Sequence, residues 1–168
     1  MSQREEFIEK LKTNDNSNDF IPLNKTFSYG RTKNTLHVHL IPKDLHSLKD
    51  KLGEDNFCVY ITQELEDFLS RLQKIVESDP SIENVFAVSP IFYHDTWKFA
   101  FEDEGFDIVK EILLDENDGM SIEQKKFFLD MFKGRRVFYT NISREELLSR
   151  GYTKFEDVNK QYEEIIDE

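Results

Sequence analysis

One stretch of the sequence, residues 63–77, constrains the fold more than any other. Its apolar residues recur at intervals of three and four, so they form one stripe along a helix, with charged residues on the opposite side. The stripe consists of Leu65, Phe68, Leu69, Leu72, Ile75 and Val76. A helix with such a face must bury it, so another layer of structure has to lie against it.

A strand predicted over residues 84–92 is the best candidate for that layer. Its centre, from Val85 to Val88, is apolar without polar alternation, which is typical of a strand covered on both faces. Residues 27–31 and 35–41 flank a short polar turn and predict a hairpin. We therefore expect a sheet with residues 84–92 near its middle.

The remaining patterns predict two further strands and several helices. Trp97, Phe99 and Phe101 alternate with less bulky residues, which predicts a strand beside residues 84–92 with one aromatic face. Residues 135–141 predict another strand. Helices are predicted over residues 4–11, 43–52, 106–113, 122–133 and 144–150 and from residue 153 onward, with capping boxes at Ser121 and Ser143.

Strands and helices thus interleave along the chain. This order predicts one α/β domain of the mixed α+β kind over residues 1–168, with a mixed sheet of about five strands layered with amphipathic helices. Residues 13–19 are polar and turn-prone, and they predict a flexible loop.

The charge balance excludes two classes of partner. The chain has 22 basic and 34 acidic side chains and a formal net charge of −12, so we expect neither direct nucleic-acid binding nor attachment to an anionic membrane. Cys58 is the single cysteine, and the first residues carry no apolar secretion signal. We expect a cytoplasmic protein, and the scarcity of alanine beside abundant Lys, Asn and Ile is typical of an AT-rich bacterial genome.

The most specific chemical pattern is the segment Thr35-Leu36-His37-Val38-His39. On a strand, His37 and His39 point to the same side about 7 Å apart. The segment resembles the signature of the histidine-triad nucleotide hydrolases, with Thr35 where that family has its first histidine. The resemblance implies that His37 is the nucleophile and His39 the third histidine. The simpler interpretation places both histidines on the solvent face of the hairpin.

A divalent metal is the one cofactor for which the sequence offers ligands. His37 and His39 could bind it together with His94, which we place in a loop between the aromatic strands. All six glycines stand singly, so no glycine-rich phosphate loop of the Walker or Rossmann type exists. We expect no organic cofactor.

Acidic residues are concentrated between residues 102 and 118, where eight carboxylates stand against Lys110 alone. Such a run is either a solvated face or a surface that binds a basic protein partner. The candidate contact residues are Glu102, Asp103, Glu104, Asp107 and Glu111. Residues 102–106 also resemble the Glu-x-x-Gly-Phe turn of GNAT acetyltransferases, although the pyrophosphate-binding motif of that family is missing; this resemblance implies an acyltransferase.

These observations favour a small acidic protein that acts by binding, either to a protein partner or to a small molecule, or that has a regulatory role. The alternative is an enzyme that acts on a phosphoester or nucleotide at His37 and His39, with or without a metal. An acyltransferase is the third possibility.

Overall fold

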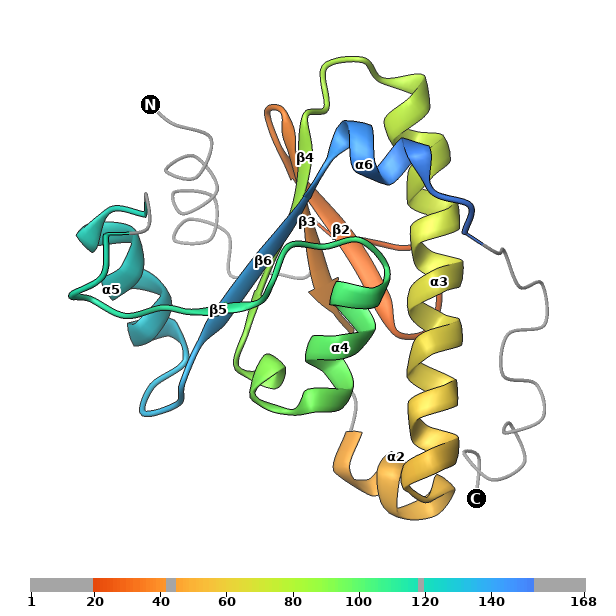
Figure 1. Cartoon of the computed structure of the whole chain (residues 1–168), viewed down its shortest axis with the longest axis horizontal. Coiled ribbons are helices and arrows are strands. Elements are labelled where there is room, and N and C mark those ends of the chain that lie inside the picture. Colours follow the sequence, from red (N-terminus) through yellow and green to blue (C-terminus); the bar gives the residue numbers. More distant parts are fainter. Residues whose placement is uncertain (1–19, 42–44, 118–119, 153–168) are drawn as a thin grey trace.

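The computed structural model describes residues 20–41, 45–117 and 120–152. It contains one mixed sheet of six strands in the order β1-β2-β3-β4-β6-β5 (Figure 1). The strands are β1 (Ile21–Pro22), β2 (Phe27–Thr32), β3 (Thr35–Leu40), β4 (Asn84–Ser89), β5 (Lys110–Glu111) and β6 (Phe138–Ser143). The helices are α2 (Leu45–Leu52), α3 (Glu54–Ser78), the 3-10 helix η2 (Pro90–Tyr93), α4 (Asp95–Asp103), α5 (Ile122–Met131) and α6 (Arg144–Ser149). The α+β fold is therefore confirmed.

The sheet has one parallel pair, β3 and β4, among the strand pairs that the structure describes. The chain connects these two strands through α2 and α3, as a parallel pair requires. The predicted hairpin is confirmed as β2 and β3, which turn at Lys33, a residue with φ of 48°. β4 lies between β3 and β6, so its predicted central place in the sheet is also confirmed.

Helix α3 begins nine residues before the predicted start. Gly53, with φ of 81°, ends α2 and allows the chain to turn directly into α3. Phe57, Tyr60 and Ile61 are buried and extend the apolar stripe by two turns at spacings of three and one. The β-branched and aromatic residues in this stretch have a weak intrinsic preference for helix. Burial of their side chains compensates for this weak preference, so the helix forms.

The predicted aromatic strand at residues 97–101 is wrong, because these residues lie in α4. Trp97 and Phe101 are four residues apart and both are buried on one side of the helix, while Phe99 between them is 51% exposed. A spacing of four fits one face of a helix as well as it fits one face of a strand. Asp95 in the first turn further favours the helix.

The predicted helix at residues 106–113 is also wrong. This segment is extended and forms β5 at the edge of the sheet, where the Asp107 amide donates to Asn141 and the Ile112 amide donates to Val137. The Glu102 carboxylate accepts a hydrogen bond from the Val109 amide at 2.8 Å. Backbone pairing with β6 therefore takes the place of hydrogen bonds within a helix.

Helices cover both faces of the sheet (Figure 1). On one face lies the α3 core, whose central residues are Phe27, Leu36, Ile61, Leu65, Phe68, Leu69, Leu72, Val85 and Trp97. On the other lies the α5 core, formed by Phe86, Ile112, Met120, Phe128, Val137 and Tyr139. Successive residues of β4 alternate between the two, with Val85 and Ala87 in the α3 core and Phe86 in the α5 core.

The two helices predicted from capping residues are present. Ser121 and Gln124 form a reciprocal capping box at the start of α5, and Ser143 caps α6 by accepting from the Glu146 amide. No helix within the described residues is long and apolar enough to span a bilayer. The predictions for residues 4–11, for the loop at 13–19 and for a helix from 153 lie outside the described residues.

Candidate ligand-binding site

The parallel strands β3 and β4 separate toward their carboxyl ends. Their pairing covers Thr35 to His37 on β3 and ends at the pair His37–Phe86. Both strands continue for three residues beyond that pair, to Leu40 and Ser89. The carboxyl ends of parallel strands are where ligands most often bind in open α/β sheets, so this gap is a candidate binding site.

On β3, the backbone groups that face the gap belong to Val38 and Leu40. Hydrogen-bonding residues alternate along an antiparallel pair, and at the end of the β2–β3 ladder the Ile41 amide donates to the Thr26 carbonyl at 2.8 Å. In the same register, His39 turns its peptide groups toward β2. Val38 and Leu40 therefore turn theirs toward β4.

The same alternation on β4 directs Val88 toward β3. The Arg144 amide donates to the Glu83 carbonyl at 2.8 Å, so Glu83 and every second residue after it turn their peptide groups toward β6. The residues between them, which include Val88, turn theirs toward β3. The Val38 carbonyl and the Val88 amide are the first acceptor and donor beyond the last paired residues, His37 and Phe86. They face each other across the gap without forming a ladder bond.

A pocket of about 200 Å³ occupies this gap. Its walls come from both strands, from η2 and α4 on one face of the sheet, and from the end of α5 on the other. The lining residues are Phe27, Val38, His39, Leu40, Ala87, Val88, Ser89, Ile91, Phe92, Trp97, Phe101 and Phe132. We call it the strand pocket. Its walls are mainly apolar and include several aromatic rings, and His39 and Ser89 supply its polar side chains.

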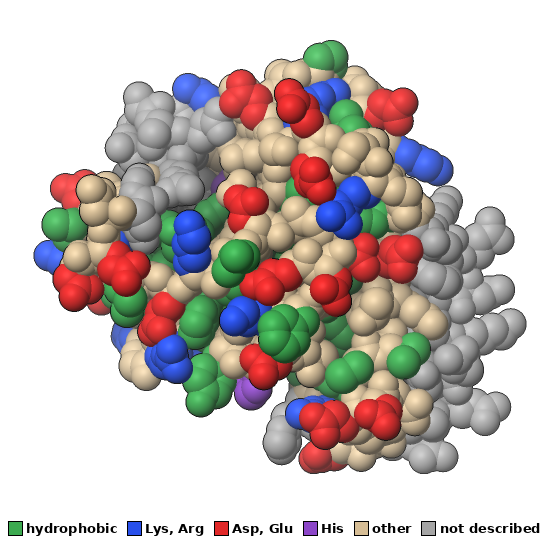
Figure 2. Space-filling model, viewed as in Figure 1, with side chains coloured by type: hydrophobic (Ala, Val, Ile, Leu, Met, Phe, Trp, Pro, Cys, Tyr) green, Lys and Arg blue, Asp and Glu red, His purple; other side chains and the backbone are tan. Residues whose placement is uncertain are grey.

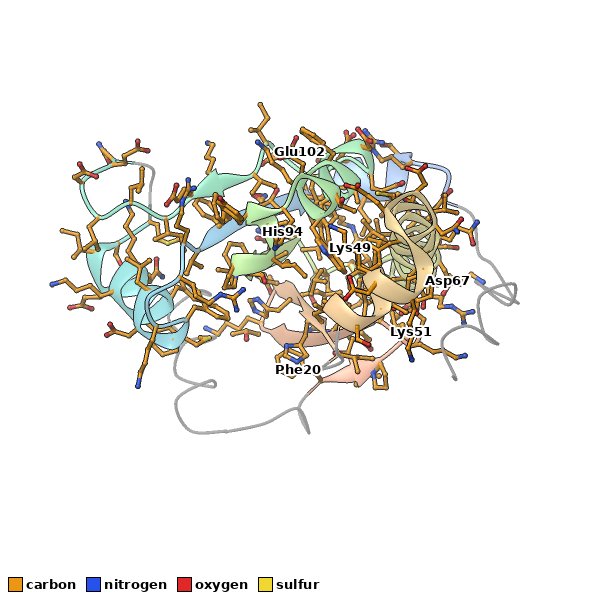
Figure 3. All side chains as sticks on the ribbon, turned by 90° about the horizontal axis from the view of Figure 1, so that it is seen from below. Phe20, Lys49, Lys51, Asp67, His94 and Glu102 are labelled. Carbon is orange, nitrogen blue, oxygen red and sulfur yellow. The ribbon has the colours of Figure 1, made fainter. Side chains whose placement is uncertain are left out.

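A second pocket of about 260 Å³ shares Ile91 and Trp97 with the first. Its other lining residues are Leu45, Lys49, Phe57, His94, Thr96 and Arg135. Figure 3 shows Lys49 on α2 and His94 at the start of α4 on neighbouring elements. We call it the basic pocket because Lys49, His94 and Arg135 surround it, and none of its lining residues in the described part of the chain is acidic.

The basic pocket is an exception to the charge of the chain. Lys49, His94 and Arg135 form no side-chain hydrogen bond or ion pair within the described residues, whereas Arg31, Arg71, Arg136 and Arg150 all pair with carboxylates. The two cations of this set, Lys49 and Arg135, focus a positive potential on the concave surface of the pocket. Because the chain has a net charge of −12, an anionic ligand is attracted to this pocket more than to the rest of the surface.

His39 contributes polarity to the strand pocket without charge. Its ring is half-buried and stacks on Phe20, with ring centroids 4.3 Å apart. Burial lowers the pKa of His39 below 6.5, so the imidazole is neutral at neutral pH and offers one donor and one acceptor. Gly30 makes room for this stack, because a Cβ there would lie 2.8 Å from the Phe20 ring.

His37 does not lie where the simpler interpretation placed it. It is 3% exposed, faces the α5 core and packs edge-on against Phe86 with ring centroids 6.1 Å apart. The expectation of two histidines on a solvent face is therefore wrong, because the α5 core covers that side of β3. His39 lines the strand pocket and His37 does not.

The three proposed metal ligands do not lie around one pocket. His39 lines the strand pocket and His94 the basic pocket, while His37 is buried beside Phe86. Among the residues that the structure describes, no three His, Cys, Asp or Glu side chains are grouped so as to hold a metal ion. His94 also precedes α4 instead of lying between two strands.

The acidic stretch has more structural roles than the sequence suggested. Glu102 accepts from the Val109 amide, and Glu111 accepts two hydrogen bonds from Arg136, which lower the pKa of Glu111. Burial and then the neighbouring Glu66 raise the pKa of Glu104. Asp103 and Asp107 are exposed, and Figure 2 shows the carboxylates of this face dispersed among apolar and basic side chains.

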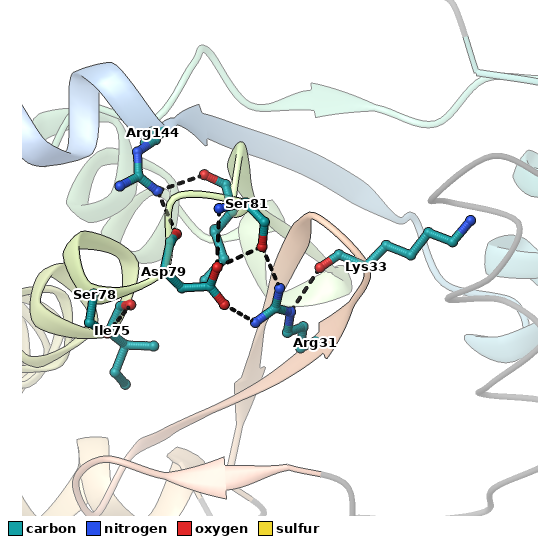
Figure 4. Close-up of polar contacts among 8 residues, drawn as sticks. Arg31, Lys33, Ile75, Ser78, Asp79, Ser81 and Arg144 are labelled. Carbon is teal, nitrogen blue, oxygen red and sulfur yellow. Dashed lines mark hydrogen bonds and ion pairs between the residues drawn. The ribbon is translucent and has the colours of Figure 1, made fainter.

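At the opposite end of β3 and β4, a polar network fixes the strands (Figure 4). Asp79, after α3, accepts hydrogen bonds from Ser81 and from Arg31 of the hairpin. Arg144 of α6 donates to the carbonyl oxygens of Asp79 and Ile82 at 2.8 and 3.0 Å. The hydrogen bonds of Ser81 and then Arg31 lower the pKa of Asp79 to about 2.

Of the residues that line the two pockets, the sequence predicts only His39 and His94 as site residues. The sequence pattern predicts strands at Trp97, Val88 and Ser89, and Lys49 and Arg135 belong to no motif. One signal was available: a strand at 35–41 followed by helices and then a strand at 84–92 predicts a parallel pair whose carboxyl ends meet.

Comparison with known proteins gave no match to a family model, to a curated protein or to a solved structure.

Proposed function

We propose that this protein binds a small anionic molecule, with an apolar, planar part in the strand pocket and an acid group in the basic pocket. The observation that carries the proposal is that Ile91 and Trp97 line both pockets, so the two pockets lie next to each other. A ligand with an aromatic body and a phosphate or carboxylate would contact both. The proposal keeps the binding role that the composition favoured.

Burial and charge support such a ligand on separate grounds. Aromatic walls favour a flat apolar body, and a cavity in which it is largely enclosed is typical of small-molecule sites. Lys49 and Arg135 supply cations to the acid group and His94 supplies an imidazole ring, and a few convergent polar groups are what such sites use to orient their ligands. A cytoplasmic location, which we also propose, gives access to many metabolites of this kind.

Amide NMR spectra recorded during titration test the proposal directly. Phenyl phosphate carries both the aromatic body and the anion, benzyl alcohol carries an uncharged aromatic body, and inorganic phosphate carries the anion alone. We expect phenyl phosphate to shift the amides of Val38, Val88 and Trp97 at lower concentration than either single-feature probe. Shifts scattered away from both pockets would contradict the proposal.

Two pairs of variants locate the binding. Lys49→Gln should weaken phenyl phosphate binding roughly twofold to fivefold, as expected for one partly exposed charge pair, while Lys51→Gln on the same helix should leave it unchanged. Val88→Phe fills the strand pocket and should abolish the shifts; Val59→Phe, on the exposed side of α3, is its control. Equal behaviour within either pair would contradict the proposed site.

The enzymatic alternative would also use this region, since His39 lines the strand pocket. A nucleophilic role for His37 gains no support from its burial next to Phe86. Binding of a basic protein partner by the acidic stretch stays a separate prediction.

A further inference from the structure

The basic pocket takes its cations and hydrogen-bond donors from three separate elements. Lys49 comes from α2, Arg135 from the turn between α5 and β6, and His94 and Thr96 from the start of α4. Lys49 and Arg135 have no carboxylate partner within the described residues, unlike the arginines that form ion pairs elsewhere. Two cations that line one cavity repel each other, and an anion bound in the cavity offsets that repulsion.

The start of α4 adds a second source of positive potential to this pocket. The amides of Asp95 and Thr96 donate no hydrogen bond within the described residues, and the His94 side chain does not cap the helix. Amides that begin a helix without a capping side chain favour phosphate groups, and the helix dipole adds to this preference. α4 also follows β4 at the open carboxyl end of a parallel pair, where ligands bind in open α/β sheets.

This set of donors fits a doubly charged group better than a singly charged one. A phosphate monoester carries a charge of about −1.5 to −2 at neutral pH, whereas a carboxylate or a sulfate ester carries one negative charge. The second charge doubles the Coulomb attraction to Lys49 and to Arg135. The tetrahedral oxygens of a phosphate also point in more directions than the two oxygens of a carboxylate, and the donors of the pocket come from three elements.

We propose that the acid group of the ligand is a phosphate monoester, bound as a dianion in the basic pocket. This inference rests on the proposed function and assigns its ligand class. Lys49 of α2 and Arg135 after α5 contact the phosphate oxygens, and the Thr96 hydroxyl and the amides at the start of α4 donate to them. The ester oxygen lies near Ile91 and Trp97, which line both pockets, so the organic part of the ligand enters the strand pocket.

Three ligands with the same ring separate a phosphate from other acid groups. Phenyl phosphate has two negative charges at about pH 8, phenyl sulfate is tetrahedral with one charge, and phenylacetate is a carboxylate with one charge. Calorimetric titration at this pH should show that phenyl phosphate binds tighter than either of the others by about fivefold or more, because its second charge strengthens the attraction to two partly exposed cations. Equal affinities for the three ligands would overturn the phosphate assignment.

A double variant locates this preference. In Lys49→Gln, Arg135→Gln, the preference for phenyl phosphate over phenyl sulfate should fall to less than about twofold. Lys51→Gln, Lys133→Gln removes two charges from the same two elements at residues that do not line the pocket, and this control should keep the wild-type preference. A preference that persists in the first variant, or that falls equally in both, would overturn the assignment to the basic pocket.

The same probes distinguish failure of this inference from failure of the proposed function. If the three ligands bind equally and all of them shift the amides of Val38, Val88 and Trp97, the proposed function stands and only the phosphate assignment falls. If none of the three shifts these amides, both proposals fall.

Discussion

The two ends of the β3–β4 pair differ in pairing, in polarity and in what surrounds them. At the amino end, Thr35 and Leu36 pair with Asn84 and Val85, and the Thr35 hydroxyl contacts the Asn84 side chain at 2.7 Å. At the carboxyl end the same strands stop pairing and line a pocket. One pair of strands thus contains both a fixed end and an open end.

The difference shows how two strands can separate at one end to form a pocket and still keep their register at the other end. Charged and polar side chains from the hairpin, α3 and α6 converge on Asp79 and the residues after it at the fixed end. These bonds set the register of β3 against β4, so the open end does not need pairing to keep the strands in place. Separation of the strands there leaves backbone groups available to a ligand.

Truncation of one leucine at each end of β3 should give the largest contrast. Leu36 is 0% exposed in the α3 core, so Leu36→Ala should destabilise the protein by about 2 to 5 kcal/mol. Leu40 is half-buried at the edge of the strand pocket, so Leu40→Ala should cost roughly half as much. Urea unfolding of both variants measures the difference, and equal losses would show that the open end is packed as tightly as the fixed end.

Loss of one arginine at each end should give the next largest contrast. Arg144 donates to two backbone carbonyls at the fixed end, so Arg144→Gln should lower the free energy of unfolding by about 1 to 2 kcal/mol. Arg135 at the open end forms no such bond within the described residues, and Arg135→Gln should change it by less than about 0.5 kcal/mol. If Arg144→Gln and Arg135→Gln destabilised the protein equally, the fixed end would not differ from the open end in its structural role.

The two ends should also lose stability in different ranges of pH. Burial lowers the pKa of His39 in the folded protein below 6.5, so the unfolded chain binds more protons than the folded one as the pH falls below that value. The stabilising effect of a neutral His39 is therefore complete above pH 6.5 and declines as the pH falls toward the lowered pKa. Melting temperatures between about pH 5 and 7.5 should show this decline in the wild type and not in His39→Gln.

At the fixed end the decline comes in acid. Asp79 has a pKa of about 2 in the folded protein against 3.8 ordinarily, so its contribution is complete above pH 3.8 and is lost as the pH falls toward about 2. Asp79→Asn should flatten the acid limb of the stability profile and leave the limb near pH 6 unchanged. If either variant altered the other limb, the two ends would not titrate independently.

The sequence predicts the structure of the fixed end much better than that of the open end. The alternation in residues 35–41 and the continuous apolar run from Val85 to Val88 indicate which residues are buried. This burial pattern predicts the strands and their place in the sheet. Leu36 and Val85 were therefore assigned correctly. His37 was not, because a polar residue on a strand gives no sign that a second helical layer will cover it.

The open end depends on features that a local pattern does not contain. Trp97 and Phe101 fit one face of a strand or of a helix, and only their packing beside α3 decides between the two. The gap itself arises where pairing stops, and the lengths of β3 and β4 do not reveal that point. Lys49 and Arg135 lie about 85 residues apart in sequence, so their convergence on one pocket becomes visible only in the fold.

Exposed acidic residues away from both ends should have the smallest effect on stability. Asp103 and Asp107 are exposed and, unlike Glu102 and Glu111, hold no backbone amide or arginine through a described side-chain bond. Replacing both with Asn should change the free energy of unfolding by less than about 0.5 kcal/mol. A larger loss would mean that this region is a third structural element beside the two ends.

The same double variant tests whether the acidic stretch binds a basic partner. A lysine-rich peptide should associate with the wild-type protein faster at low salt than at physiological ionic strength, because exposed charges steer the encounter and salt screens them beyond about 8 Å. The Asp103→Asn, Asp107→Asn variant should associate more slowly and show a weaker salt dependence. A Glu123→Gln, Glu145→Gln variant removes the same charge from α5 and α6 and is the control. If both variants slow association equally, the peptide responds only to net charge, and the acidic stretch acts as a solvated face.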